Sequence, residues 1–465
     1  MTPASPHQDC YDVAIIGAGV VGCAMARRFT LDGARVVVIE KGRDVLDGAS
    51  KANSAILHTG FDAPPGSLEQ ACIAKGYAEY LEIREGLGLP LLKSGAMVLA
   101  WDADQLARLD GLIDKAHTNG VDDVAMLTRD QIIAREPALS PTLMGGFDIP
   151  REFLIDPWAT AHAYVLQALA NGADLRRDCE VLKGRFDGEQ WAIETNRKEI
   201  NAKMVINCAG LYGDVIDQRL LGTSTFSIKP RKGQFVVFDK PASNLLKAVI
   251  LPVPTATTKG VVIFRTIFGN LAVGPTAEEQ TSREDASTEA QTLHDLRTKG
   301  IQMLPGLAGF EVTTTYAGLR PATEHQDYQI TQDQARHYVT VGGIRSTGLS
   351  AALGIAAHVA TLNAGAGFSG GPINTPICPA PDRLSDYHPR DWQNTGHGGI
   401  ICHCEMVTRR EIEAALNGPM PPATLQGLKR RTRVCMGRCQ GFYCTGPLAE
   451  MTQGRLTPPI GVTDD

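Results

Sequence analysis

Two groups of residues at opposite ends of the chain have types and spacings that suit redox chemistry. The first is a glycine motif over Gly17–Gly22, which follows a short apolar segment. The second is a set of five cysteines between Cys402 and Cys444. Glycines at this spacing favour a dinucleotide, and thiolates at this density suit an iron–sulfur cluster, which carries one electron at a time. Because flavin exchanges electrons both in pairs and singly, the combination favours FAD over NAD.

The segments around the glycine motif predict a βαβ unit. A strand over residues 11–16 enters the turn, a helix over Cys23–Asp32 follows it, and a second strand over Ala34–Ile39 ends at Glu40. Glu40 lies eighteen residues after Gly22, where it can accept hydrogen bonds from ribose hydroxyls and repel a 2′-phosphate.

Each glycine of the motif has a separate physical role. Gly17 permits the tight turn, Gly19 lets the backbone approach a pyrophosphate, and Gly22 allows the helix to pack closely on the strand. The pattern alone is weak, since Gly365–Gly370 also matches it. That second copy follows a helical segment and leads into Pro372, so we interpret it as a loop.

The composition is that of an ordinary globular protein. The chain has 465 residues, enough for two or three domains, of which 43% are hydrophobic and 21% charged. A net charge of −6 gives no indication of nucleic-acid binding. The first residues show no signal peptide, and no apolar stretch is long enough to span a bilayer. We therefore expect a cytoplasmic protein, with peripheral membrane association left open.

The middle of the chain mixes helical and strand-like segments. Periodicity predicts helices over residues 68–87, 103–118 and 157–171, and strands over residues 260–265 and 338–341. Residues 371–399 are rich in Pro and Gly and are interpreted as a linker.

Five further motifs support a family resemblance. They are Ala52–Gly60, Thr258-Lys259-Gly260, Gly269–Thr276, Ala317–Pro321 and Gly342–Ser350. On these segments the chain resembles the FAD-dependent oxidoreductases of the D-amino-acid oxidase superfamily, over about residues 11–365. Within it, the chain is most similar to glycerol-3-phosphate dehydrogenases and oxidases and to L-2-hydroxyglutarate dehydrogenases. The cysteine region resembles the [2Fe-2S] module of bacterioferritin-associated ferredoxin.

The resemblance implies an α/β fold, α+β overall. A Rossmann-like FAD-binding domain is interleaved with a mostly antiparallel substrate domain over residues 11–370. The linker over residues 371–399 then leads to a small helical [2Fe-2S] domain over residues 400–448.

The flavin site implied by the resemblance combines the glycine motif with residues further along the chain. The positions that match flavin contacts are Gly17, Gly19, Gly22, Glu40, Ser50, Ser54, Gly210, Gly348 and Leu349. A helix beginning near Gly348 would direct its positive end at the flavin. The alternatives are a small-residue turn at Gly348 and an ordinary strand-to-loop turn at Gly210.

Three residues are candidates for the substrate side. His58 matches the family histidine beside the flavin and could take a hydroxyl proton. Arg320, in Gly-Leu-Arg-Pro, could bind a carboxylate or a phosphate, and Lys259 matches a family substrate-side lysine. The alternatives are a structural role for His58, a structural ion pair for Arg320 and an exposed position in a hairpin for Lys259. Lys229, Arg231 and Lys232 are interpreted as solvated residues of a loop and are given no role.

The family pattern implies four cluster ligands, Cys402, Cys404, Cys439 and Cys444. Cys435 departs from the pattern and is either a bystander or an alternative ligand. A zinc site or free thiols are the other interpretations of the cysteines. The sequence Thr408-Arg-Arg-Glu411 predicts a capping box that opens a helix over Arg409–Leu416.

Together these residues predict an FAD-dependent dehydrogenase that oxidises the secondary alcohol of a small anionic substrate, such as glycerol 3-phosphate or a 2-hydroxy acid. Electrons would leave through the [2Fe-2S] cluster to a quinone, a partner flavoprotein or another carrier. The alternatives are an amino-acid, imino-acid or opine dehydrogenase, and a non-catalytic electron-relay subunit.

Overall fold

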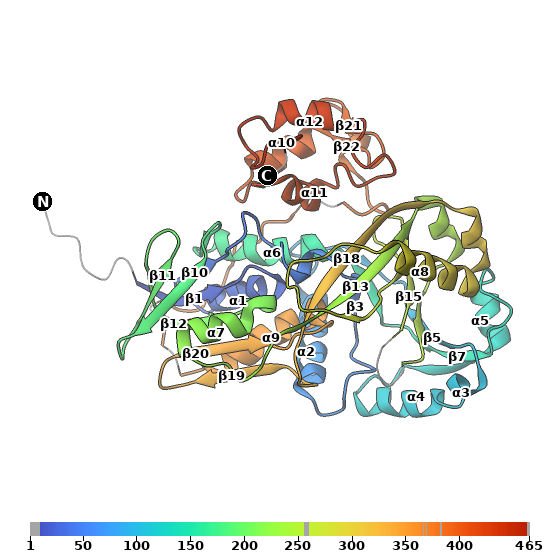
Figure 1. The fold of residues 1–465 in the computed structure, drawn as a ribbon, viewed down its shortest axis with the longest axis horizontal. Coiled ribbons are helices and arrows are strands. Elements are labelled where there is room, and N and C mark those ends of the chain that lie inside the picture. The colour runs from blue at the N-terminus through green and yellow to red at the C-terminus, as the bar shows by residue number, and fades with distance from the viewer. Residues whose placement is uncertain (1–9, 255–259, 366, 369, 382–383, 463–465) are drawn as a thin grey trace, which may run out of the picture.

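The computed structural model describes residues 10–462, apart from residues 255–259, 366, 369, 382 and 383. Two sheet-based parts lie side by side, and a small, mainly helical domain built from the C-terminal residues stands against them (Figure 1). In the part of the chain that the structure describes, every helix is too short or too polar to cross a membrane.

The first sheet has a parallel centre. Its parallel strands run in the order β20 (Tyr338–Gly342), β12 (Ile200–Asn207), β1 (Cys10–Ile16), β2 (Val36–Ile39) and β9 (Asp174–Arg176). The antiparallel additions are β10 (Val181–Phe186), β11 (Trp191–Thr195) and β19 (Gln329–Asp333). This arrangement confirms the Rossmann-like part of the predicted fold class.

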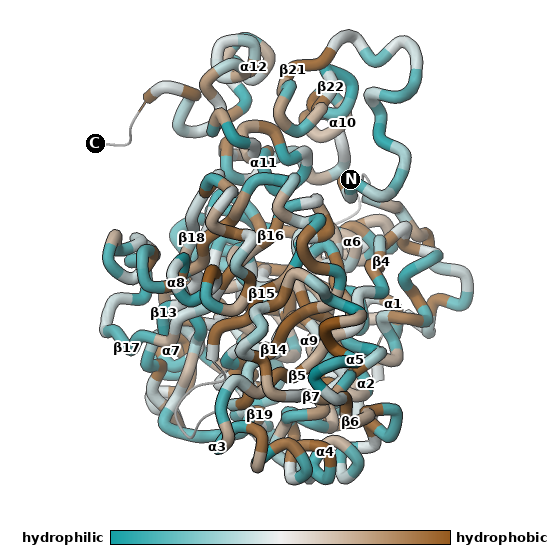
Figure 2. Tube along the Cα trace, turned by 90° about the vertical axis from the view of Figure 1, so that its right-hand side faces the viewer, coloured by the Kyte–Doolittle hydropathy of each residue, from teal (hydrophilic) through white to brown (hydrophobic). Residues whose placement is uncertain are grey.

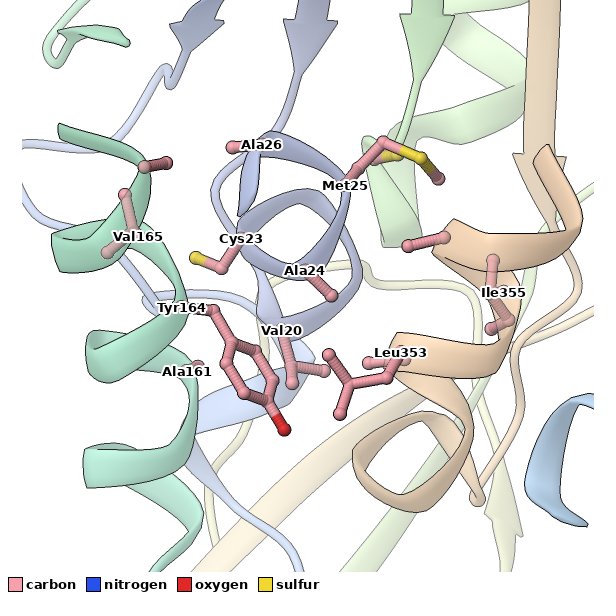
Figure 3. Packing of buried hydrophobic residues seen from close by; sticks show 14 of the residues in the cluster. Val20, Cys23, Ala24, Met25, Ala26, Ala161, Tyr164, Val165, Leu353 and Ile355 are labelled. Atoms are coloured by element: carbon pink, nitrogen blue, oxygen red, sulfur yellow. The ribbon is translucent and has the colours of Figure 1, made fainter. Parts of the chain in front are cut away.

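Both faces of the parallel centre are covered, so its strands β1 and β2 are almost entirely buried and apolar. Val13 and Ile15 contact one layer of helices, whereas Ala14 and Ile16 face the other side, where α7 (Gly213–Leu221) packs. The first layer comprises α1 (Val20–Leu31), α2 (Leu68–Ile83), α6 (Pro157–Ala170) and α9 (Gly348–Leu362). Figure 3 shows α1 between α6 and α9, with small side chains such as Ala24 and Ala161 that let the helices approach closely.

The second sheet is mostly antiparallel. Its strand order is β17 (Glu278–Glu279), β13 (Lys229–Phe238), β16 (Leu271–Gly274), β15 (Val262–Arg265), β14 (Val249–Pro252), β5 (Ala96–Ala100), β7 (Gly145–Ile149) and β6 (Ala125–Thr128). Strand β18 (Val312–Ala322) also pairs with β13. These strands come from two stretches of sequence separated by strands of the first sheet, which confirms the predicted interleaving.

The helices predicted over residues 68–87 and 157–171 are confirmed as α2 and α6, and the strands over residues 260–265 and 338–341 as β15 and β20. The single helix predicted over residues 103–118 is wrong. It is divided into α3 (Ala103–Leu106) and α4 (Leu109–Thr118). Leu106 is 38% exposed whereas Leu109 is fully buried, because the chain turns between them to bring Leu109 into the core.

The C-terminal domain contains β21 (Ile400–Cys402), β22 (Val407–Thr408), α10 (Arg409–Asn417), α11 (Leu425–Thr432) and α12 (Thr445–Met451). Its core is small and apolar, with Val407, Ile412 and Leu428 fully buried. The predicted capping box is confirmed, since the Thr408 hydroxyl accepts from the N–H of Glu411 and the Glu411 carboxylate accepts from the N–H of Thr408.

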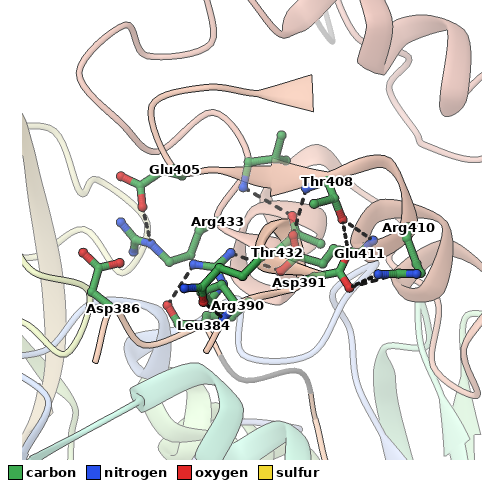
Figure 4. A network of polar contacts seen from close by, with 12 residues as sticks. Leu384, Asp386, Arg390, Asp391, Glu405, Thr408, Arg410, Glu411, Thr432 and Arg433 are labelled. Atoms are coloured by element: carbon green, nitrogen blue, oxygen red, sulfur yellow. Dashed lines mark hydrogen bonds and ion pairs between the residues drawn. The ribbon is translucent and has the colours of Figure 1, made fainter. Parts of the chain in front are cut away.

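The segment over residues 371–399 connects this domain to the rest. Its described residues form no helix longer than the single turn η5 (Asp391–Gln393). Figure 4 shows how it is held against the C-terminal domain: Arg390 pairs with Glu411 at 3.1 Å, and Asp391 binds both Arg410 and the hydroxyl of Thr408. Figure 2 shows the same domain standing above both sheets, with apolar segments gathered in the middle of the molecule.

A buried ion pair fixes the C-terminal domain on the first sheet. Asp44, in the loop after β2, is 1% exposed in its side chain and accepts two hydrogen bonds from Arg431 of α11, at 2.8 and 3.0 Å. Gly427 on the same helix leaves room for this contact, because a Cβ there would lie 1.7 Å from the Asp44 carboxylate. The domain is therefore docked by a specific, desolvated contact.

We predict that Asp44→Ala lowers the free energy of unfolding by about 3 kcal/mol, because it leaves Arg431 buried without its carboxylate. Urea denaturation of the full chain measures the loss. The control is Glu413→Ala, which removes an exposed partner of Arg409 at 3.9 Å and should cost less than about 0.5 kcal/mol. Equal losses in the two variants would contradict the docking role of Asp44.

Candidate active site

A cavity of about 720 Å³ lies where the two sheets meet. It brings together most of the residues predicted for the flavin and the substrate, namely Gly17, Gly19, Glu40, Ser50, Ser54, His58, Gly210, Arg320, Gly348 and Leu349. Gly22 lies behind its wall, in the first turn of α1. Lys259 lies outside the described residues. A cavity of this size is within the range for a ligand site of a globular enzyme.

The glycine motif forms a cradle at the N-terminus of α1. Gly17 has φ +104°, a conformation that favours glycine, and a Cβ there would lie 2.5 Å from the carbonyl oxygen of Cys208. A Cβ on Gly22 would lie 1.9 Å from the carbonyl oxygen of Gly17, so only glycine lets α1 approach the turn. Gly19 is the N-cap residue and makes no side-chain cap, which leaves this helix end open to a phosphate.

Glu40 supports this cradle directly. One carboxylate oxygen accepts from the N–H of Ala18 and the other from the N–H of Gly42, each at 2.7 Å. Burial raises the pKa of Glu40, and these two N–H groups oppose that shift. A carboxylate has about four acceptor positions, so it retains capacity for ribose hydroxyls while it holds the loop.

The remaining flavin-side residues line the cavity from three other segments. The Ser50 hydroxyl accepts from the N–H of Val20 at 3.0 Å, so it lies at the open end of α1. Gly210 follows β12 with φ +53°. Gly348 and Leu349 are the first residues of α9, so the N-terminus of that helix faces the cavity as expected. This ring of N–H groups and small residues fits an extended dinucleotide.

His58 is held by a carboxylate that the sequence did not reveal. Its Nδ1 lies 2.9 Å from Glu152, whose side chain is fully buried. The other oxygen of Glu152 accepts from the N–H and the hydroxyl of Thr59, at 2.6 and 2.7 Å. Pairing of the short strands β3 (Ile56–Leu57) and β8 (Phe153–Ile155) brings the two residues together across 94 positions of sequence. With Nδ1 bound to Glu152, Nε2 is the nitrogen available to a ligand.

Arg320 presents a positive charge to the cavity. Its two terminal nitrogens each donate to the carbonyl oxygen of Thr276 at 3.2 Å, and no carboxylate among the described residues forms an ion pair with it. Burial, and then the neighbouring Arg231, lower the pKa of Arg320 to about 10. Arg231, which was given no role from the sequence, lies on β13 and lines the same cavity. The site therefore favours an anion.

The five C-terminal cysteines form one group of three, around Cys444, and one pair. The thiols of Cys402 and Cys444 are hydrogen-bonding neighbours, as are those of Cys404 and Cys439, and the Cys435 sulfur lies 3.4 Å from that of Cys444. Within the described ranges, no three Cys, His, Asp or Glu side chains converge around a single metal position. The four proposed ligands, Cys402 with Cys444 and Cys404 with Cys439, fit a cluster in which each of two irons takes two sulfur ligands.

The backbone around Cys439 also suits a thiolate ligand. The N–H of Tyr443 lowers the pKa of Cys439, with smaller contributions from Cys404 and from the N–H groups of Gly441 and Phe442. Burial raises the pKa of Cys402 and of Cys444 to about 11, so these thiols would need a bound cation to ionise at neutral pH. The donor set is therefore compatible with bound iron.

Comparison with known families agrees with this geometry. Residues 12–362 match the family of FAD dependent oxidoreductases, and residues 400–452 match the BFD-like [2Fe-2S] binding domain. The predicted cofactors, FAD and a [2Fe-2S] cluster, are thereby confirmed, as is the resemblance inferred from the motifs.

Similar proteins with known activities cover much of the chain. A glycerol 3-phosphate dehydrogenase of Caloramator mitchellensis is 33% identical over 96% of this chain and 94% of its own length. The mitochondrial L-2-hydroxyglutarate dehydrogenase of Homo sapiens is 27% identical over 60% of this chain and 64% of its own. Among solved structures, the FAD-bound L-α-glycerophosphate oxidase of Mycoplasma pneumoniae has a TM-score of 0.74 at 26% identity, covering 80% of this chain and 98% of that one.

We predict that Cys439→Ser abolishes assembly of the cluster whereas Cys435→Ser preserves it, because only the first removes one of the four proposed ligands. Iron and sulfide content per chain and visible absorption measure both variants after anaerobic reconstitution. Flavin content serves as the internal control for folding of the larger domains. Loss of iron in Cys435→Ser with retention in Cys439→Ser would exchange the two assignments.

Proposed function

Because the chain belongs to the family of FAD dependent oxidoreductases and carries a [2Fe-2S] domain, we propose that it is a dehydrogenase of the secondary alcohol of a small anionic substrate. Glycerol 3-phosphate is the first candidate, since the relative similar over nearly the whole chain is a glycerol 3-phosphate dehydrogenase. A 2-hydroxy acid such as L-2-hydroxyglutarate is the second. The observation that carries this proposal is one cavity with a carboxylate-bound histidine and an arginine that has no acidic partner among the described residues.

His58 is the proposed base. Glu152 accepts the Nδ1 proton and so fixes the tautomer in which Nε2 has a free lone pair. Because Glu152 is fully buried, its charge also stabilises the imidazolium that forms when His58 takes the hydroxyl proton. When bound, FAD supplies the acceptor for the hydride, which leaves the carbon that bears the hydroxyl. The oxidation of an amine needs only a deprotonated substrate, whereas the oxidation of an alcohol needs a base for the hydroxyl proton. The pair of His58 and Glu152 therefore favours an alcohol.

Arg320 is the proposed anchor for the anionic end of the substrate. A guanidinium that already donates to one carbonyl retains further N–H groups for a carboxylate or phosphate. Its lowered pKa remains above neutrality, so it is charged when the substrate binds. An anchor of this kind turns the alcohol carbon toward the flavin side of the cavity and limits its motion.

A continuous column of side chains supports electron exit toward the C-terminal domain. Trp158 donates from Nε1 to the carbonyl of Lys51, in the wall of the cavity, at 3.0 Å. The Trp158 ring stacks on Phe268 at 5.4 Å, and the guanidinium of Arg433 lies 3.9 Å from the centre of the Phe268 ring. Arg433 binds Glu405, next in sequence to the proposed ligand Cys404. A quinone, a partner flavoprotein or another carrier is the proposed final acceptor.

An anaerobic substrate screen tests this function. The purified holoenzyme is mixed with glycerol 3-phosphate, L-2-hydroxyglutarate, glycine and L-proline, and the absorbance of oxidised flavin is followed. We expect bleaching by a hydroxy anion and none by the amino acids. Bleaching by an amino acid alone would overturn the alcohol assignment, and bleaching only by a reduced redox protein would favour an electron-relay subunit.

We predict that His58→Asn slows flavin reduction by the active substrate about 10²–10⁴-fold, the usual contribution of a general base. Glu152→Gln should slow it less and shift its pH dependence, because the imidazolium loses its charged partner. Stopped-flow absorbance across pH measures both variants. Glu82→Gln, at an exposed position of α2, is the control, and a pH profile unchanged in Glu152→Gln would contradict the role of Glu152.

A further inference from the structure

Two arginines face each other directly across neighbouring strands in the wall of the cavity. In the antiparallel pairing of β13 with β18, Arg231 is the register partner of Arg320. Both residues line the cavity, as expected for opposed positions on one face of a sheet. Like charges at opposed positions destabilise a sheet, and Arg320 forms no ion pair among the described residues, so this pair of arginines favours an anionic ligand between or above them.

The space around Arg320 is shaped for this arrangement. The guanidinium of Arg320 lies over Gly233, two residues along β13 from Arg231, and a Cβ at position 233 would lie 2.5 Å from its Nη2. That Cβ would also lie 2.9 Å from Pro275. A side chain at position 233 would therefore displace the guanidinium of Arg320, and glycine lets it lie close over β13.

Arg231 has a second neighbour on its other side. In the pairing of β13 with β17, Arg231 is the register partner of Glu279, and its Nη2 donates to that carboxylate at 2.6 Å. The three adjacent strands thus carry one negative and two positive charges in a row. The Glu279 side chain is 69% exposed, and an ion pair of this kind adds little stability. Arg231 can therefore share its N–H groups with a ligand at small cost.

We propose that Arg231 and Arg320 together bind the phosphate dianion of a phosphate monoester substrate, and that Arg231 sets the preference for phosphate over carboxylate. This inference rests on the proposed function, since it concerns the same cavity. A phosphate monoester carries close to two negative charges at neutral pH and three acceptor oxygens, which match two guanidinium groups. A carboxylate carries one charge and matches the single fork of Arg320.

Binding of inorganic phosphate and of acetate to the FAD-loaded protein tests the proposal by isothermal titration calorimetry, without turnover. Arg231→Gln should weaken phosphate binding about 10-fold or more, the usual effect of losing a charged hydrogen bond, and change acetate binding less than about 3-fold. Arg231→Lys should recover part of the phosphate affinity. Arg320→Ala should weaken both anions. Equal effects of Arg231→Gln on phosphate and acetate, or no effect on either, would overturn the selective role.

Two further variants separate ligand binding from strand pairing. Glu279→Gln releases Arg231 from its surface partner and should leave phosphate binding unchanged or strengthen it. If it weakened phosphate binding as much as Arg231→Gln does, the ion pair would be structural and the proposal would fail. Lys183→Gln breaks a comparable exposed pair with Glu194 at 3.0 Å, on the β10–β11 hairpin, and should change nothing. Flavin content and thermal melting verify that each variant is folded.

These measurements remain interpretable if the proposed function is wrong. If no hydroxy anion bleaches the flavin of the unchanged protein, the dehydrogenase assignment fails whatever phosphate binding shows. If glycerol 3-phosphate bleaches the flavin and Arg231→Gln lowers kcat/KM for it no more than for L-2-hydroxyglutarate, the dehydrogenase assignment stands and the role of Arg231 fails.

Discussion

The close approach of α1 to the turn after β1 is the constraint on which the rest of the structure depends. No side chain fits between them, since a Cβ on Gly22 would lie 1.9 Å from the carbonyl oxygen of Gly17. This contact aims the N-terminus of α1 into the cavity. It also sets the position of Ala18, whose N–H donates to Glu40. Glu40 begins the loop whose Asp44 binds the C-terminal domain. A dinucleotide cradle and a docking platform thus share one backbone arrangement.

The substrate side depends on buried charge held in place before any ligand arrives. Glu152 has no exposed surface, and its oxygens are occupied by His58 and Thr59. Among the described residues, Arg320 is hydrogen-bonded through one backbone carbonyl, that of Thr276. Such groups cost stability when they are desolvated, but they need little rearrangement during reaction. The apolar cores on both faces of the second sheet offset this loss of stability.

The sequence predicted what is encoded locally. The glycine motif, the capping box at Thr408 and the cysteine spacing each depend on residues close in the chain, and they indicated the fold class and both cofactors. The pairing of His58 with Glu152 spans 94 residues and arises from two short strands that carry no periodic signal. Arg231 was missed for the same reason, because only strand register places it opposite Arg320. The break between α3 and α4 reflects tertiary burial of Leu109, which overrides helical periodicity.

The loop after β2 contacts both cofactor-binding parts of the chain. Glu40 opens it beside the dinucleotide cradle, and Asp44 closes it beneath α11. A substitution that displaces this loop would therefore disturb the dinucleotide cradle and the docking of the C-terminal domain together.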